Sequence, residues 1–259
     1  MISMVLTVRG ADSCRLRNFY AVLRHFSRIF KDWEYVVVEQ DSYSKIDRSC
    51  LGCDVLHSLA FNPGVFNKSW GLNLGYRRSS GDMIVFADSD IIVPSQHMTM
   101  AIKALDLGVD LVRPYRSIVD LGCAETEAYL TGGRFPKIDN ERALNRNYLG
   151  ENLCLAGGIF AIRRDRFEYF GGFDEEFVGW GGEDDAFSIR AQALSDKTRI
   201  ARRALAWHLW HPRQDREMAG SYDRNLDRLS SYYLLDRDQH REAAKVNLGG
   251  IARIDKYHG

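Results

Sequence analysis

The first half of the chain alternates short apolar runs with longer amphipathic segments, and this alternation restricts the fold more than any other feature of the sequence. Ile2–Val8 and Glu34–Glu39 are apolar runs of strand length, whereas Asp12–Phe30 carries its apolar residues at helical spacing. Strands separated by helices are typical of a mostly parallel sheet with right-handed crossovers. The pattern therefore predicts an α/β fold with helices on the faces of a central sheet.

The alternation continues to Arg113, is then lost, and returns near Ala156. The further strands that we expect are Asp54–Ala60, Met83–Ala87, one beginning at Asp110–Arg113, Ala156–Arg163 and Ala204–His208. The further helices that we expect are Asn67–Ser80, Gln96–Leu107, Asp165–Phe170, one opened by Gly181–Gly182, and a charged tail from Ser221. Tyr115–Asn152 is polar and aperiodic, so we expect a long irregular segment there, which is usually functional or mobile.

The length and charge of the chain indicate how many domains it forms and which partners it binds. The chain has 259 residues, 45% of them hydrophobic, which suffices for one α/β domain, and no repeat or low-complexity linker separates a second one. Lys plus Arg and Asp plus Glu are equal at 35 each, which argues against a nucleic-acid binder that neutralises many phosphates. We therefore expect a single domain over residues 1–259 and no nucleic-acid partner.

The cysteines and the apolar runs of the sequence indicate the cellular compartment of the protein. Five cysteines are an odd number, which argues against a disulfide framework, and the pair Cys50 and Cys53 lacks the second Cys or His pair of a structural zinc site. The apolar run at residues 2–8 is too short to span a membrane, and no later run approaches the length of a transmembrane helix. We expect a cytoplasmic protein that is at most peripheral to the inner face of the membrane.

Two carboxylates follow the expected strand Met83–Ala87. Asp88 and Asp90 flank one small residue in the segment FADSDIIVP, and in an extended stretch residues i and i+2 point to the same side. Both acids could then face one cation, since Mg²⁺ and Mn²⁺ bind oxygen ligands. Arg9 and Glu39 stand at the ends of other expected strands, where parallel sheets bind ligands. Acidic triplets of this spacing are also common in solvated turns, so the signal is weak on its own.

The segment HLWHP offers two candidate metal ligands, His208 and His211. Imidazole together with carboxylate suits Mn²⁺ better than Mg²⁺. Each histidine taken singly is more often structural than a ligand, and the pair could instead cap a turn.

The segment GWGGEDD is more specific. Glu183, Asp184 and Asp185 form the first turn of an expected helix, where the helix dipole favours acids. That effect does not account for Trp180 and Gly181–Gly182, which predict a flexible loop whose aromatic ring stacks on a sugar and closes over it. A carboxylate directly behind such a loop is placed to act as general base on a hydroxyl.

Three blocks of the chain resemble the β-1,4-galactosyltransferase family, an inverting GT-A family related to bacterial chondroitin-type and polypeptide N-acetylgalactosaminyltransferases. The blocks are Phe66–Arg77 (FNKSWGLNLGYR), Phe86–Pro94 (FADSDIIVP) and Ala156–Asp185, which ends in GWGGEDD. His208–His211 stands where the family keeps its C-terminal metal ligands. The resemblance implies a single GT-A domain, a Rossmann-like α/β fold.

The resemblance implies a separate role for each of three parts of that domain. Residues 1–113, the half that includes the DxD strand, would bind the nucleotide. Residues 114–211 would carry the acceptor and catalytic groups, and residues 212–259 would form a helical tail.

The resemblance also implies roles for individual residues. Asp90, His208 and His211 would bind the metal, which is Mn²⁺ or, as the alternative, Mg²⁺. Asp184, the middle acid of the triplet, would be the general base. It would take the proton of an acceptor hydroxyl while the hydroxyl oxygen attacks the anomeric carbon in line and inverts its configuration.

The substrates follow from the same resemblance. The donor-binding set would be Arg9, Glu39, Phe66, Lys68, Asp88, Leu155, Gly158, Trp180 and Glu183, and the acceptor-binding set Trp180 and Asp185. Lys68 stands where relatives often have Arg. Leu155 replaces a hydroxyl-bearing aromatic residue of galactose-specific members and leaves space for an N-acetyl group. The expected donor is UDP-GalNAc or UDP-Gal, and the expected acceptor a saccharide or glycolipid.

Two other functions fit parts of the pattern. A nucleotidyltransferase shares the strand and DxD arrangement but usually has a Gly-rich basic signature after its first strand, and Arg9–Asp12 is too sparse for one. A catalytically inactive, sugar-binding relative would need aromatic stacking but neither an aligned base nor a metal set. Asp90, Asp184 and His211 therefore favour the transferase.

Overall fold

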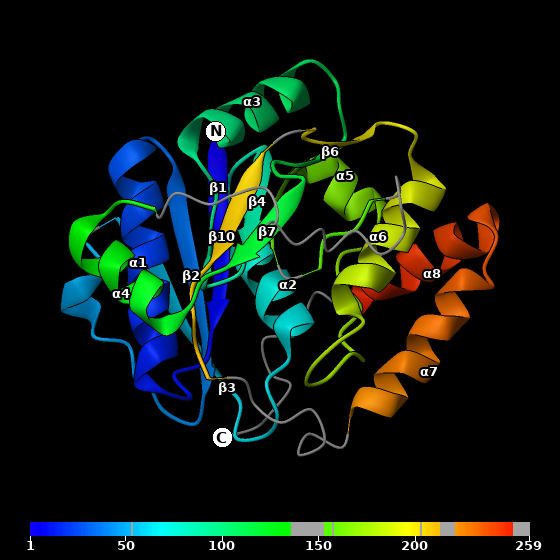
Figure 1. Cartoon of the computed structure of the whole chain (residues 1–259). Coiled ribbons are helices and arrows are strands. Elements are labelled where there is room, and N and C mark those ends of the chain that lie inside the picture. Colours follow the sequence, from blue (N-terminus) through cyan, green and yellow to red (C-terminus); the bar gives the residue numbers. More distant parts are fainter. Residues whose placement is uncertain (53, 136–152, 157, 203, 213–220, 251–259) are drawn as a thin grey trace.

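A seven-stranded sheet runs through the centre of the molecule (Figure 1) in the computed structural model, which describes residues 1–52, 54–135, 153–156, 158–202, 204–212 and 221–250. Its strand order is β3-β2-β1-β4-β8-β6-β9. Among these described strands only β8 runs antiparallel to its neighbours. The predicted α/β fold with a mostly parallel sheet is therefore confirmed.

Most of the elements expected from periodicity are present, with ends that differ by a few residues. The strands are β1 (Ile2–Val8), β2 (Glu34–Asp41), β3 (Val55–Phe61), β4 (Met83–Ala87), β5 (Ile91–Ile92), β6 (Leu111–Arg113), β7 (Ser117–Asp120), β8 (Ile159–Arg163), β9 (Thr198–Ile200) and β10 (Leu205–His208). The helices are α1 (Ser13–Ile29), the 3-10 helix η1 (Arg48–Cys50), α2 (Lys68–Arg78), α3 (Ser95–Asp106), α4 (Cys123–Gly132), α5 (Arg164–Tyr169), α6 (Glu183–Leu194), α7 (Tyr222–Tyr233) and α8 (Arg237–Gly250).

Helix α2 lies directly on β1 because two glycines let the backbones approach. A Cβ atom added to Gly71 would lie 2.1 Å from Thr7 Oγ1, and one added to Gly75 would lie 2.3 Å from Val5 Cγ1. The side chain of Asn67 caps the helix by accepting a hydrogen bond from a backbone N–H of the first turn. These contacts fix the first turn of α2 at the carboxyl end of β1.

An aromatic cluster fills the core between the sheet and the helices α5 and α6. Its rings come from β4, β8, α5, α6 and the segment that precedes α6, and their centroids lie 4.6–6.1 Å apart. The members are Phe86, Phe160, Phe167, Phe173 and Phe187. Such contacts add to the free energy of apolar burial. They hold the first turn of α6 near the end of β4.

A second sheet of three strands, in the order β5-β10-β7, was not predicted in full. The expectation that Tyr115–Asn152 is irregular is wrong for the first part of this segment, which contains β7 and α4. Residues 136–152 lie outside the described residues. Strand β7 has four residues and pairs with β10, far along the chain. Strand β7 is too short to show an alternation, and α4 buries only Thr126 and Tyr129, too few residues for a helical period to show in the sequence.

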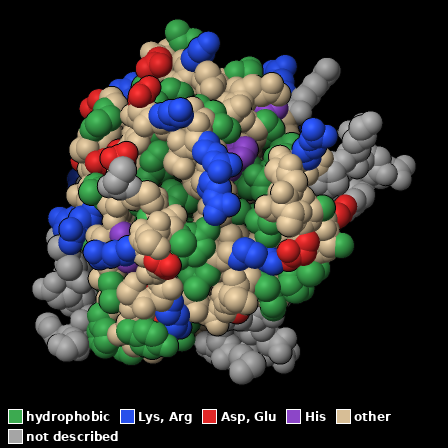
Figure 2. Space-filling view, turned by 90° about the vertical axis from the view of Figure 1, so that its left-hand side faces the viewer, with side chains coloured by type: hydrophobic (Ala, Val, Ile, Leu, Met, Phe, Trp, Pro, Cys, Tyr) green, Lys and Arg blue, Asp and Glu red, His purple; other side chains and the backbone are tan. Residues whose placement is uncertain are grey.

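The surface mixes side chains of different kinds. On the face that α1 and α4 cover, at the left of Figure 1, Lys and Arg form several groups separated by apolar and neutral side chains (Figure 2). Within the described part of the chain, no helix is both long enough and apolar enough to cross a membrane.

The expected helical tail is present as α7 and α8, and an ion pair holds it to the body of the protein. Asp174, whose side chain is 3% exposed, accepts hydrogen bonds of 2.7 Å from Arg228 Nε and from the Tyr232 hydroxyl. Burial alone would raise the pKa of Asp174, but these hydrogen bonds outweigh it and hold the pKa below the ordinary value of 3.8. The carboxylate is therefore ionised in the folded protein and joins α7 to the segment before α6.

We predict that Asp174→Asn lowers the free energy of unfolding at pH 7 by about 1–3 kcal/mol, the loss of one charge-assisted hydrogen bond. Since the folded pKa is depressed, the stabilisation is present above about pH 4 and is lost as the pH falls below it. Urea denaturation at pH 7 and at pH 3 measures both effects. Asp227→Asn, the same change at an exposed position of α7, should have little effect. Equal stability of Asp174→Asn and wild type at pH 7 would contradict this account.

Candidate active site

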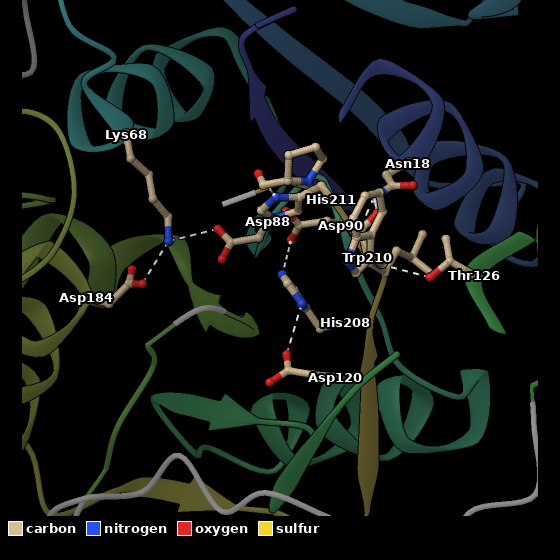
Figure 3. Close-up of polar contacts among 12 residues, drawn as sticks. Asn18, Lys68, Asp88, Asp90, Asp120, Thr126, Asp184, His208, Trp210 and His211 are labelled. Carbon is tan, nitrogen blue, oxygen red and sulfur yellow. Dashed lines mark hydrogen bonds and ion pairs between the residues drawn. The ribbon is translucent and has the colours of Figure 1, made fainter. Parts of the chain in front are cut away.

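The candidate site lies where β4 ends, beside the first turns of α2 and α6 (Figure 3). Asp88 directly follows β4, and residues 89–90 form a turn rather than the extended stretch that we expected. The two acids therefore have different partners: Asp88 Oδ1 lies 2.8 Å from Lys68 Nζ, and Asp90 Oδ2 lies 3.2 Å from His211 Nε2. That both acids face one cation stays a prediction.

Lys68 lies among three carboxylates. It is the first residue of α2, and its Nζ is 2.7 Å from Asp184 Oδ2, 2.8 Å from Asp88 Oδ1 and 3.5 Å from Glu183 Oε1. Figure 3 shows the ammonium group between Asp88 and Asp184. One cation thus joins the acid of the DxD segment to the expected general base.

The balance of charge around Lys68 perturbs the titration of its neighbours. Burial raises the pKa of Asp88 to about 6, with the charge of Lys68 opposing the rise and that of Asp184 adding to it. Burial and Asp184 likewise raise the pKa of Glu183 to about 7 against the effect of Lys68. Burial alone would lower the pKa of Lys68, but the carboxylates outweigh it and hold the pKa well above its usual range. A further cation bound here would favour the ionised carboxylates.

The loop before α6 has left-handed backbone angles, and the helix begins directly after it with the acid triplet in its first turn. Gly179, Gly181 and Gly182 have φ angles of 82°, 97° and 93°, which side chains disfavour. A Cβ atom on Gly182 would also lie 2.7 Å from Cε1 of Phe177. Asp184 is 7% exposed at the start of the helix. The glycines are therefore required by geometry and not only by the expected flexibility.

The expected lid residue is exposed, and the tail contacts its loop. The side chain of Trp180 is 51% exposed, and its ring centroid lies 5.3 Å from that of Tyr222 at the start of α7. Asn225 Nδ2 donates to the carbonyl oxygens of Val178 (3.1 Å) and Trp180 (3.2 Å). The sequence did not indicate this contact between α7 and the loop. The movement of the loop on donor binding stays a prediction.

The expected metal ligands come together. One ligand atom from each of Asp90, His208 and His211 lies within 4.8 Å of the other two. Burial alone would raise the pKa of Asp90, but both imidazoles oppose this and hold the pKa below its usual range. A carboxylate and two imidazoles suit Mn²⁺, Fe²⁺, Co²⁺ or Zn²⁺ and are a poor set for Mg²⁺. The residues therefore fit a divalent transition-metal ion.

Arg9 and Phe66, the expected uridine-binding pair, lie together at the end of β1. The guanidinium carbon of Arg9 is 5.9 Å from the ring centroid of Phe66. Its nitrogens donate to the backbone carbonyls of Gln40 (2.8 Å), Asn62 (2.7 Å) and Gly64 (2.5 Å). Arg9 thus holds the end of β2 and the segment after β3 beside the ring. Its contact with a base stays a prediction.

Glu39 does not stand at the end of its strand, because β2 continues to Asp41. Its side chain is fully buried and accepts hydrogen bonds from the backbone N–H of Lys45 (2.6 Å) and from Ser44 Oγ (2.7 Å), and lies 3.0 Å from His57 Nε2. These contacts hold the loop that follows β2. A direct role of Glu39 in donor binding stays a prediction.

Leu155 and Gly158 line a small cavity together with Lys68, Asp88 and Asp184. The Leu155 N–H donates to Ser188 Oγ (3.0 Å) on α6. A Cβ atom on Gly158 would lie 1.6 Å from the hydroxyl of Tyr115. That hydroxyl is buried and has no hydrogen-bond partner among the residues that the structure describes. Tyr115 was missed in the sequence because it lies in the segment expected to be irregular.

Two further residues were missed. Asp120, at the end of β7, has its Oδ1 3.0 Å from His208 Nδ1. Cys154 Sγ donates to Asp185 Oδ1 at 3.7 Å, next to the expected acceptor site. Neither residue belongs to a motif, since each contacts a residue far along the chain.

Comparison with known proteins gives two family matches. The profile described as glycosyl transferase family 2 matches residues 15–170. The profile described as N-terminal domain of galactosyltransferase matches residues 144–207. The second match includes the GWGGEDD segment.

Two relatives are similar over part of the chain. Polypeptide N-acetylgalactosaminyltransferase 3 of Taeniopygia guttata is 35% identical over 75 residues, which are 29% of this chain and 12% of that protein. Beta-1,4-galactosyltransferase 4 of Homo sapiens is 28% identical over 131 residues, which are 49% of this chain and 29% of that protein. The chain thus spans less than a third of either relative. The expected resemblance to these two kinds of transferase is confirmed.

Solved structures share the fold. A mannosyltransferase from Pyrobaculum calidifontis in complex with GDP-Man and Mn²⁺ has a TM-score of 0.59 at 16% identity, over 98% of this chain and 73% of that one. Glucosyl-3-phosphoglycerate synthase from Mycobacterium tuberculosis in complex with Mn²⁺, UDP-Glc and phosphoglyceric acid has a TM-score of 0.54 at 19% identity, over 90% and 79%. The expected GT-A fold is confirmed.

Proposed function

Since the chain belongs to glycosyl transferase family 2, we propose that it is a metal-dependent, inverting glycosyltransferase. It transfers a hexose or N-acetylhexosamine from a UDP-sugar to a hydroxyl of a saccharide or glycolipid. The observation that carries the proposal is the position of Asp184, which faces Asp88 across Lys68 beside the set Asp90, His208 and His211. A carboxylate base, a lysine and a metal-type ligand set near the end of β4 match the needs of glycosyl transfer.

Family membership disfavours a nucleotidyltransferase, the first alternative. An inactive sugar-binding relative, the second, has no use for a buried carboxylate at the start of α6 or for three metal-type ligand atoms within 4.8 Å. Both features favour an active enzyme.

The proposed reaction is one displacement at the anomeric carbon. The acceptor oxygen forms a bond to the anomeric carbon while the bond between that carbon and the diphosphate oxygen breaks. The electron pair of the broken bond leaves with the diphosphate. Asp184 takes the acceptor proton, so no covalent sugar–enzyme intermediate is needed. Attack opposite the leaving group inverts the configuration.

Lys68 links the donor to the base. Its ammonium group is 2.7 Å from Asp184 Oδ2, so the ion pair occupies that oxygen of the proposed base. A bound diphosphate is a stronger anionic partner for a lysine that already contacts Asp88. Transfer of Lys68 to the diphosphate then breaks the ion pair at Asp184 Oδ2, and Asp184 takes the proton of the acceptor hydroxyl.

Asp90, His208 and His211 would hold the metal ion. When bound, the ion neutralises negative charge that develops on the departing diphosphate. The two solved neighbours each contain Mn²⁺, which agrees with a set of one carboxylate and two imidazoles. One of them holds a UDP-sugar and the other a GDP-sugar, so uridine is proposed here from Arg9 and Phe66 rather than from the fold.

We predict that Asp184→Asn binds donor but loses turnover by about 10²–10⁴-fold, the usual contribution of a positioned general base. The amide cannot accept the proton. Asp185→Asn, the same change at the next residue, is the matched control and should retain more activity. Turnover under saturating donor, together with donor affinity by calorimetry, measures both effects. Near-normal turnover of Asp184→Asn with a large loss in Asp185→Asn would move the base to Asp185.

We predict that turnover requires a divalent cation and that Mn²⁺ supports it better than Mg²⁺, because two of the three ligands are imidazoles. His211→Ala should weaken Mn²⁺ binding and lower turnover without a change in the unfolding temperature of the metal-free protein. Assays after chelation, with each metal added back, measure the requirement. Full turnover in excess chelator would refute it.

We predict that the enzyme uses UDP-GalNAc somewhat better than UDP-Gal, because Leu155 leaves space at the sugar C2 and offers no hydrogen bond to a 2-hydroxyl. One group in an apolar pocket is worth about 1–3 kcal/mol, so both donors can be substrates. Leu155→Tyr should shift the ratio of kcat/KM toward UDP-Gal. Leu155→Phe adds the bulk without the hydroxyl and separates steric exclusion from hydrogen bonding. An unchanged ratio in both variants would exclude Leu155 as the selector.

A further inference from the structure

We propose that Asp120 is a positioning residue of the metal site, which holds the His208 ring so that its Nε2 faces Asp90. The inference rests on the proposed function only in that Asp90, His208 and His211 are taken to bind a divalent cation. Asp120 lies in the segment that the sequence left without an assigned element, and it has no role in the reaction as described above.

The contacts of the His208 ring carry the inference. Its Nδ1 lies 3.0 Å from Asp120 Oδ1, and its Nε2 lies 3.7 Å from Asp90 Oδ1 (Figure 3). A carboxylate only accepts hydrogen bonds, so the contact at Nδ1 requires that this nitrogen carry the proton. In the neutral ring the Nε2 lone pair is then directed at Asp90 and is free to bind a cation.

The second histidine has the same arrangement with a different acceptor. Nδ1 of His211 lies 2.9 Å from the backbone carbonyl oxygen of Pro212, and its Nε2 lies 3.2 Å from Asp90 Oδ2. Both rings therefore turn Nδ1 toward an oxygen and Nε2 toward the same carboxylate. A shared orientation of this kind is the usual outer support of metal-bound histidine.

The three-stranded sheet explains how Asp120 comes to this position. In the pairing of β10 with β7, His208 lies opposite Asp120, and in the pairing of β10 with β5 it lies opposite Ile91, which follows Asp90. The backbone bonds Leu121 N to His208 O (2.9 Å) and Leu209 N to Asp90 O (2.8 Å) continue both ladders. The sheet thus sets Asp120, His208 and Asp90 in a row across neighbouring strands.

The test is the affinity of the full chain for Mn²⁺ alone, from the electron paramagnetic resonance signal of the free ion. Asp120→Ala should weaken Mn²⁺ binding by about 10–100-fold, the usual effect of removing such a support. Asp120→Asn keeps an oxygen acceptor for Nδ1–H and should retain most of the affinity. Ser117→Ala, on the same strand, is the control and should bind Mn²⁺ as wild type does.

A double variant separates positioning from the alternatives. If Asp120 acts through His208, Asp120→Ala causes no further loss in a His208→Ala background. A further loss there would overturn the inference, since Asp120 would then be a ligand itself or a general structural support. Normal affinity of Asp120→Ala, with weaker binding in His208→Ala and His211→Ala, would overturn this inference alone. Normal affinity in both histidine variants would instead remove the proposed metal site.

Discussion

The crowding of carboxylates at the end of β4 is the constraint on which the rest of the site depends. Buried acids this close repel one another, and burial disfavours their charged forms. The protein divides them between two kinds of nitrogen partner. Lys68 takes Asp88, Glu183 and Asp184, whereas the two imidazoles take Asp90. A diphosphate attracts a lysine, and a metal ion binds imidazole. Each of these partners is therefore a group that a substrate or an ion would bind. The site is therefore held together by groups that a bound donor and metal ion would engage.

Three separate parts of the fold bring these groups together. Gly71 and Gly75 let α2 approach β1, which puts Lys68 at the end of the sheet. The aromatic cluster holds the first turn of α6 beside β4. The three-stranded sheet sets His208 next to the residue that follows Asp90. Each of these supports joins segments that are far apart in the sequence, so the geometry of the site is a property of the tertiary fold.

The sequence predicted the parts of the fold and site that have a local pattern. The strand β1 and the helix α1 were visible from the period of their apolar residues, and GWGGEDD indicated the start of α6. The partners of these groups could not be predicted. Strand β5 has two residues and β7 has four, too few for an alternation to show, and both depend on β10. The pairing of Lys68 with Asp184 joins residues far apart in the chain, and no motif records it.

The tail contributes to the site in a way that its composition did not suggest. Asn225 of α7 donates to two carbonyls of the Trp180 loop, and Asp174 ties α7 to the segment just before that loop through Arg228 and Tyr232. Any displacement of the loop must break the Asn225 hydrogen bonds or carry α7 with it. The anchor at Asp174 resists the second course, since it would break the hydrogen bonds of Arg228 and Tyr232 to a buried carboxylate. The first course leaves α7 in place, so a loop that closes over a sugar must exchange two tail hydrogen bonds for contacts with its ligand.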